Sequence, residues 1–149
     1  MTDFLAEPEQ RFSCTRCAHC CHHSTFPLVM NDEEHAWFAD QHLGDVFADI
    51  GDTPVAVRVV DDCWHLAWRN EHCIFLSEEG LCRIHRDVGA EAKPAGCRQF
   101  PLLYVETPDG LLVHASFVSP AVVRNVGPRL AEQQDWLESS YQDQRRWGY

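Results

Sequence analysis

The sequence is short of the features that mark membrane, secreted and nucleic-acid-binding proteins. It has no apolar run near the ~20 residues that a helix needs to span a bilayer. Residues 1–11 are polar and acidic, without the apolar segment of a secretory signal. Lys and Arg number only 12 against 23 Asp and Glu, and a net charge of −11 disfavours binding to phosphate backbones or anionic lipids. We therefore expect a cytoplasmic protein that binds neither nucleic acid nor membrane.

Familiar catalytic and nucleotide-binding motifs are missing as well. The eight glycines are scattered rather than gathered in a phosphate-binding loop, and there is no H-E-x-x-H pair of zinc ligands. The rest of the composition is ordinary for a globular chain, with 45% apolar and 23% charged residues. A length of 149 residues suits one domain and leaves little room for a second.

The pattern along the chain predicts a small single-domain α+β protein with hairpins, a few helices and a cysteine-rich core organised by metal. Residues 1–13 read as an N-terminal lead-in that frays. Residues 14–127 read as a cysteine-cluster metal-binding domain. Residues 128–149 read as a C-terminal helix packed on the same domain.

Two segments carry helix signals. Asn31 or Asp32 is suited to cap a helix that Gly44 would end. Pro128 is suited to open a second helix that continues to about Arg146.

Strand and turn signals occupy the middle of the chain. The β-branched run at 55–60 predicts a strand, with alternate valines on one face. Hairpin turns are predicted at 77–80, where Gly80 is free to take positive φ, and at 107–110, the clearest turn signal in the sequence. Residues 83–92 suit a short helix or a loop that stops before Pro94.

Cysteine is the anomaly in this composition. Eight thiols in a chain without an export signal indicate metal or redox chemistry more than disulfides. Buried, inert cysteines are the alternative, which weighs most for Cys63, and disulfides would follow if the protein were exported. The cysteines are Cys14, Cys17, Cys20, Cys21, Cys63, Cys73, Cys82 and Cys97.

The first four cysteines form the run C-x-x-C-x-x-C-C. Three cysteines at three-residue spacing can converge on one point, as in iron–sulfur proteins, and C-x-x-C pairs also hold zinc. Neighbouring side chains usually diverge, so we expect Cys20 and Cys21 to serve different metals, or one of them to lie outside the ligand shell. Cys73 and Cys82 flank a predicted turn that would bring their sulfurs together.

Several polar residues near the cysteines are weaker candidates. Histidines 22 and 23 follow the run directly and suit either a ligand role or an exposed loop. Arg98 follows Cys97 and suits either neutralisation of thiolates or simple solvation. A further ligand or base is available around Cys63 from Asp61, Asp62, His65 and His72.

These motifs resemble the YkgJ-like cysteine-cluster family, described as zinc- or iron-chelating. After C-x-x-C-x-x-C-C, the family has C-x-F-L, C-x-I-Y and R-P-x-x-C-R-x-F-P elements, which match segments 73–76, 82–85 and 93–101 here. The resemblance implies that the metal ligands are Cys14, Cys17, Cys20, Cys21, Cys73, Cys82 and Cys97.

This chain departs from the family pattern at a few positions. Lys93 stands for the usual Arg and His85 for the usual Tyr, and the stretch between Cys82 and Cys97 is long. Ser119 stands where some relatives carry a further cysteine. An eighth family ligand is therefore in doubt.

The cofactor expected from this pattern is zinc or iron in one or two sites. Seven thiols suit a division into four and three, and C-x-x-C-x-x-C is more typical of a [4Fe–4S] cluster than of zinc modules. The alternative function is a metal-dependent redox or protein-modifying enzyme acting on a protein or peptide partner. Flagellin lysine N-methyltransferases, which are associated with an iron–sulfur cluster and S-adenosylmethionine, have a similar cysteine motif. A third alternative is a binding module that holds metal to shape a surface.

Overall fold

The computed structural model describes residues 2–22, 28–59 and 62–148, and confirms a mixed α+β fold. The chain forms two compact units. Unit 1 comprises Met1–His19 and Gln99–Tyr149, and unit 2 comprises Cys20–Arg98. Within the described ranges, no helix has the length and apolar character needed to cross a membrane.

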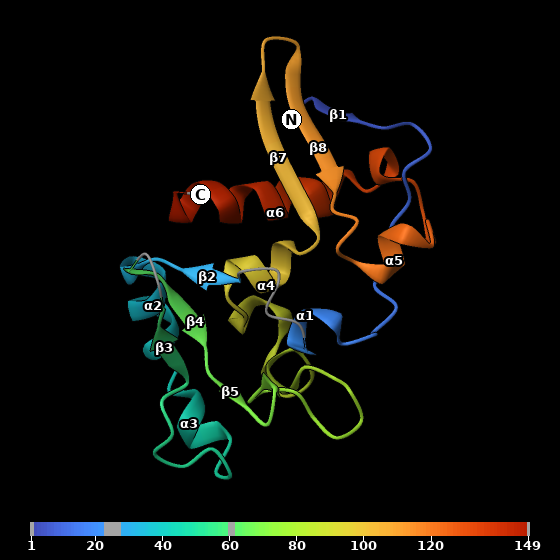
Figure 1. Ribbon diagram of the computed structural model, residues 1–149. Helices are drawn as coiled ribbons and strands as arrows, with labels where there is room; N and C mark the ends of the chain where they lie inside the picture. Colours follow the sequence, from blue (N-terminus) through green and yellow to red (C-terminus); the bar gives the residue numbers. More distant parts are fainter. Residues whose placement is uncertain (1, 23–27, 60–61, 149) are drawn as a thin grey trace. The chain divides into compact units, whose positions relative to one another are not determined.

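Unit 1 is built on a three-stranded sheet with the order β1-β8-β7. Strands β7 (Leu102–Thr107) and β8 (Gly110–Ala115) form the predicted hairpin (Figure 1), and Gly110 takes the positive φ of 141° that glycine allows. Strand β1 (Phe4–Ala6) pairs with β8 in parallel. The expectation that the lead-in frays is therefore wrong, because residues 4–6 are hydrogen-bonded into the sheet and Phe4 is buried.

The inner face of this sheet packs on α6 (Gln134–Trp147), which crosses the hairpin (Figure 1). Leu137 and Tyr141 from the helix meet Leu102 and Val113 from the strands. The sequence predicted that this helix begins at Pro128, but it begins at Gln134. A separate 3₁₀ turn, Leu130–Glu132, precedes the helix. The turn ends because the backbone of Gln133 is not helical. The short helix α5 (Pro120–Val123) completes the unit.

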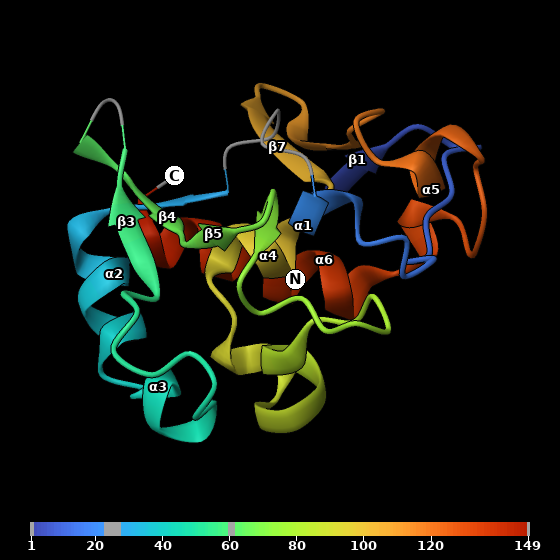
Figure 2. The ribbon, with the colours of Figure 1, turned by 60° about the horizontal axis from the view of Figure 1, so that its bottom comes forward.

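Unit 2 contains a small antiparallel sheet with the order β2-β4-β3. Its strands are β2 (Val29–Met30), β4 (Trp64–Leu66) and β3 (Ala56–Arg58), and the helix α2 (Asp32–Ala39) lies beside it (Figure 2). Strand β3 lies within the predicted segment, but Ala56 is its buried residue. Val57 is 43% exposed, and Val59, just after the strand, is 39% exposed. The strong β propensity of the valines therefore did not indicate which face is buried.

A second, two-stranded ladder joins β5 (Trp68–Arg69) and β6 (His72–Cys73). The two turn residues, Asn70 and Glu71, both have positive φ, which is the type I′ geometry that matches the twist of a tight hairpin.

The first predicted helix is confirmed at its start and corrected at its end. The side chain of Asn31 accepts a hydrogen bond from the Glu34 amide at 2.8 Å, so Asn31 is the cap of α2 (Asp32–Ala39). The helix stops five residues before Gly44. The reason is local: His42 takes a left-handed φ of 50°, and a new short helix, α3 (Leu43–Val46), begins after it.

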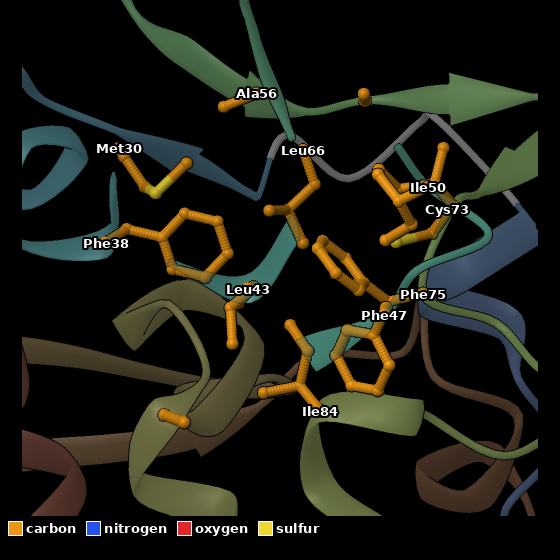
Figure 3. Close-up of a cluster of buried hydrophobic side chains, with 13 residues drawn as sticks. Met30, Phe38, Leu43, Phe47, Ile50, Ala56, Leu66, Cys73, Phe75 and Ile84 are labelled. Carbon is orange, nitrogen blue, oxygen red and sulfur yellow. The ribbon is translucent and has the colours of Figure 1, made fainter. Parts of the chain in front are cut away.

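The core of unit 2 gathers aromatic and aliphatic side chains around Phe75 (Figure 3). Phe38 and Phe47 meet the Phe75 ring edge to face, at centroid distances of 6.3 and 5.8 Å. Cys73 belongs to the same cluster. The remaining elements are α1 (His19–His22), a π-helical turn at Ile84–Val88, a 3₁₀ turn at Ala90–Ala92 and α4 (Ala95–Gln99).

Candidate metal centre

The structure gathers thiols from four separate segments of unit 2 around one cavity of about 50 Å³. Among the residues that the structure describes, the rest of the wall is mainly apolar, and its other polar side chains are His65 and Lys93. The predicted ligands Cys20 and Cys21 thus share a cavity with residues far along the chain. The lining thiols are Cys20, Cys21, Cys73, Cys82 and Cys97.

Cys20 and Cys21 come from the single turn of α1, and their Sγ atoms are 4.0 Å apart. The expectation that these neighbouring side chains diverge is wrong. Adjacent residues of a helix project about 100° apart, and the sulfurs of this pair lean toward the same cavity. Both side chains are half-buried.

Cys73 and Cys82 lie on the two sides of the predicted turn at 77–80, which the structure confirms. The Ser77 amide donates a hydrogen bond to the Leu81 carbonyl, and the Leu81 amide donates one to the Ser77 hydroxyl. Gly80 takes a φ of 77°. An antiparallel bridge then joins Leu76 to Cys82. The turn accordingly brings both thiols to the same cavity, with Cys73 buried and Cys82 half-buried.

Cys97 is positioned by α4, whose first amide is held by a buried acid. Glu34 of α2 is fully buried, and its Oε1 accepts a hydrogen bond of 2.6 Å from the Ala95 amide. The first amides of a helix have no partner within the helix, so this bond satisfies one of them and ties α2 to α4. The sequence pattern alone does not indicate this bond between Glu34 and α4. Asn31 and Glu34 have the spacing of a capping box, but that pattern predicts a bond within α2.

Replacing Glu34 by Ala should therefore destabilise unit 2. The Ala95 amide would lose its acceptor in a buried place, and we expect the free energy of unfolding to fall by about 1–3 kcal/mol. Glu33→Ala is the matched control, since Glu33 is the exposed neighbour in the same helix turn. Denaturant unfolding of both metal-free variants under reducing conditions measures the difference. Equal losses would contradict the role assigned to the Glu34–Ala95 bond.

The thiols strongly influence one another's protonation. The pKa of Cys20 is lowered from 9.0 to about 7, mainly by a hydrogen bond from Cys21 and to a smaller extent by the charge of Lys93, which together outweigh the effect of burial. The same bond, together with burial, raises the pKa of Cys21. Burial raises the pKa of Cys73 to about 12 and that of Cys97 well above its ordinary range. The metal-free cavity therefore prefers one ionised thiol beside neutral ones.

These shifts predict that the metal-free protein loses stability in alkaline solution. Below about pH 9 the Cys73 thiol is protonated in both the folded and the unfolded chain, so the folded state keeps its full advantage. Between about pH 9 and about pH 12 the unfolded thiol ionises first, and stability falls. Melting curves of the reduced, chelator-treated protein across this range test it. The Cys73→Ala variant should show a shallower decline, and a parallel decline would contradict the assignment.

Lys93 supplies positive charge to this cluster. Its charge lowers the pKa of Cys20, Cys73 and Cys97 alike. Arg98, which the sequence offered for this task, donates to the Glu91 carbonyl at 3.0 Å and lies over the Trp37 ring. In the sequence, Lys93 stands out only because it replaces the arginine that is usual in the family pattern. Its place directly before the Pro94 of a cysteine motif was the available signal.

The other predicted thiols lie elsewhere. Cys14 and Cys17 are exposed on the segment of unit 1 that leads into α1. Their ligand role stays a prediction. Cys63 precedes β4 and, of the described thiols of unit 2, is the one outside the cavity lining. Ser119 is buried at the start of α5 in unit 1.

Of the weaker histidine and acid candidates, some line the cavity and others do not. His65 lines the cavity. The His22 and His72 rings lie near each other, with centroids 5.8 Å apart. Asp62 pairs with Arg58 at 2.8 Å. Residues 23 and 61 lie outside the described ranges.

The donor set suits a thiophilic metal, but its arrangement is not yet that of a closed site. Half-buried and buried thiols around a small cavity are the ligands that zinc and iron take. Across residues 2–22, 28–59 and 62–148, no three Cys, His, Asp or Glu side chains are arranged to hold one ion together. Metal binding would therefore require the sulfurs to draw inward.

Comparison with known proteins agrees with the chemistry of the donor set. Residues 13–111, about two thirds of the chain, match the family model described as "CxxCxxCC: Putative zinc- or iron-chelating domain". The chain belongs to this family. The resemblance drawn from the cysteine motifs is thereby confirmed, and the family description supports metal binding. No curated protein and no solved structure gives a significant match.

Proposed function

We propose that this protein chelates zinc or iron through the thiols that line the cavity of unit 2. The observation that carries the proposal is the convergence of five thiols from α1, β6, α4 and the segment after the Ser77–Gly80 turn. Thiols close together in an apolar wall resist ionisation, as the raised pKa values of Cys73 and Cys97 indicate. A bound cation offsets that repulsion, so binding free energy becomes folding free energy.

The spacing of Cys20 and Cys21 favours one tetrahedral metal atom bound by both thiols over a [4Fe–4S] cluster at this pair. Two thiolates on one tetrahedral zinc, with Zn–S bonds of about 2.3 Å, lie about 3.8 Å apart. The observed 4.0 Å is close to that value. In a [4Fe–4S] cluster each cysteine binds a different iron atom, so two ligands need not approach one another so closely.

The first test is the metal content of single cysteine variants. Cys97→Ser should lose most of its bound metal, because serine is a poor ligand for zinc or iron. Cys63→Ser, a half-buried thiol of the same unit outside the cavity lining, should keep it. Anaerobic purification followed by elemental analysis gives the stoichiometry, and circular dichroism checks the fold. Unchanged metal content in Cys97→Ser would overturn the proposal.

The second test identifies the kind of centre. We expect a colourless zinc protein, or an iron protein without acid-labile sulfide. Replacement by Co²⁺ should produce the intense near-ultraviolet absorption of thiolate-to-cobalt charge transfer. A brown protein that dithionite bleaches and that releases sulfide on acidification would establish an iron–sulfur cluster. That result would contradict the single-ion centre while leaving chelation by cysteine intact.

Cys14 and Cys17 complete the family motif and are proposed as additional ligands. The double variant Cys14→Ser/Cys17→Ser separates their contribution from that of the cavity. A reduced metal stoichiometry would assign them a second ion, and a weakened affinity at unchanged stoichiometry would assign them to the same ion. Wild-type stoichiometry and affinity would remove both from the ligand set.

A further inference from the structure

We infer that His65 supplies a nitrogen ligand to the metal held by the cavity thiols, so that the centre is a mixed sulfur–nitrogen site. This inference rests on the proposed chelating function. Besides the thiols, the polar side chains that line the cavity within the described ranges are His65 and Lys93. A protonated ammonium has no lone pair to offer, whereas a neutral imidazole is among the commonest metal ligands in proteins.

The hydrogen bond of His65 fixes which ring nitrogen can bind. Nδ1 lies 2.7 Å from the Leu66 carbonyl oxygen. A carbonyl oxygen only accepts, so Nδ1 carries the hydrogen and Nε2 carries the lone pair. Histidines that bind metals commonly donate their other nitrogen to a carbonyl or carboxylate in this way, which orients the ring and raises its basicity.

The backbone of His65 is held on both sides. It lies in β4, the central strand of its sheet, in register with Val29 of β2 and Val57 of β3. Its ring centroid is 5.9 Å from that of Trp68, another residue of the cavity wall. A ligand held on a paired strand and packed against an aromatic ring loses little conformational freedom when metal binds.

Charge balance favours an imidazole over a fourth thiolate. A divalent ion with three thiolates carries one net negative charge, which the cation of Lys93 balances. A fourth thiolate would leave one negative charge uncompensated between apolar side chains such as Leu66 and Phe75, where an unpaired charge is costly. A neutral imidazole completes four-coordination without adding charge.

The test compares His65→Gln with His72→Gln in the full chain. His72 is the matched control, because it lies in the same unit, its Nδ1 is 2.9 Å from the Asn70 carbonyl, and it does not line the cavity. We expect His65→Gln to weaken Co²⁺ and Zn²⁺ binding at least about tenfold, and His72→Gln to match the wild type. His65→Cys should restore binding only in part, because a fourth thiolate adds uncompensated negative charge, and should shift the Co²⁺ spectrum to that of an all-sulfur site.

X-ray absorption of the zinc-loaded wild type provides a measurement that no variant's folding can disturb. It should show one nitrogen scatterer with an imidazole pattern among the sulfur ligands. A shell of sulfur alone, or equal affinities for the two glutamine variants, would overturn the role of His65 and leave chelation by cysteine standing. A wild-type protein that takes up neither metal would instead overturn the proposed function.

Discussion

The central constraint on unit 2 is the cost of bringing five thiols together in a small, mainly apolar cavity. Each ionised sulfur there loses hydration and repels the others, and the raised pKa values of Cys73 and Cys97 express this cost. Of the described residues that line the cavity, Lys93 carries the positive charge that opposes this repulsion. A structural role alone gives no reason to place so many thiols together, since small apolar side chains would fill the same space without electrostatic cost. The proposed cation, bound by these thiols, would offset that electrostatic cost.

Local turns and hydrogen bonds bring the thiols to the cavity from separate segments of unit 2. The turn ending in Gly80 folds the chain back so that Cys73 and Cys82 face the same space. The buried carboxylate of Glu34 fixes the first turn of the helix that carries Cys97. The site is therefore distributed over segments that share the apolar core around Phe75. Packing of that core therefore also places the thiols around the cavity.

The sequence predicted those parts of the fold that depend on short-range chemistry. Both hairpin turns and the Asn31 cap are correct, because turn and cap residues act on their immediate neighbours. The predicted ends of elements were less accurate: α2 ends at Ala39, ahead of the left-handed His42 that precedes α3, and no propensity indicates this. The burial of Ala56 in place of the neighbouring valines depends on what lies across the sheet. The cavity partners Lys93 and His65 are likewise set by long-range packing.

The adjacent pair Cys20 and Cys21 shows most clearly why sequence spacing could not settle the site. Side-chain rotamers, and not backbone direction, decide whether neighbouring sulfurs meet, and here they lie 4.0 Å apart. Without metal, one proton shared between them lowers the pKa of one sulfur and raises that of the other. A divalent ion can replace that proton and bind both sulfurs as thiolates. Because the sulfurs are already close to the separation that one tetrahedral ion requires, little reorganisation is needed at this pair, and the inward movement falls mainly to the ligands that come from other segments of unit 2.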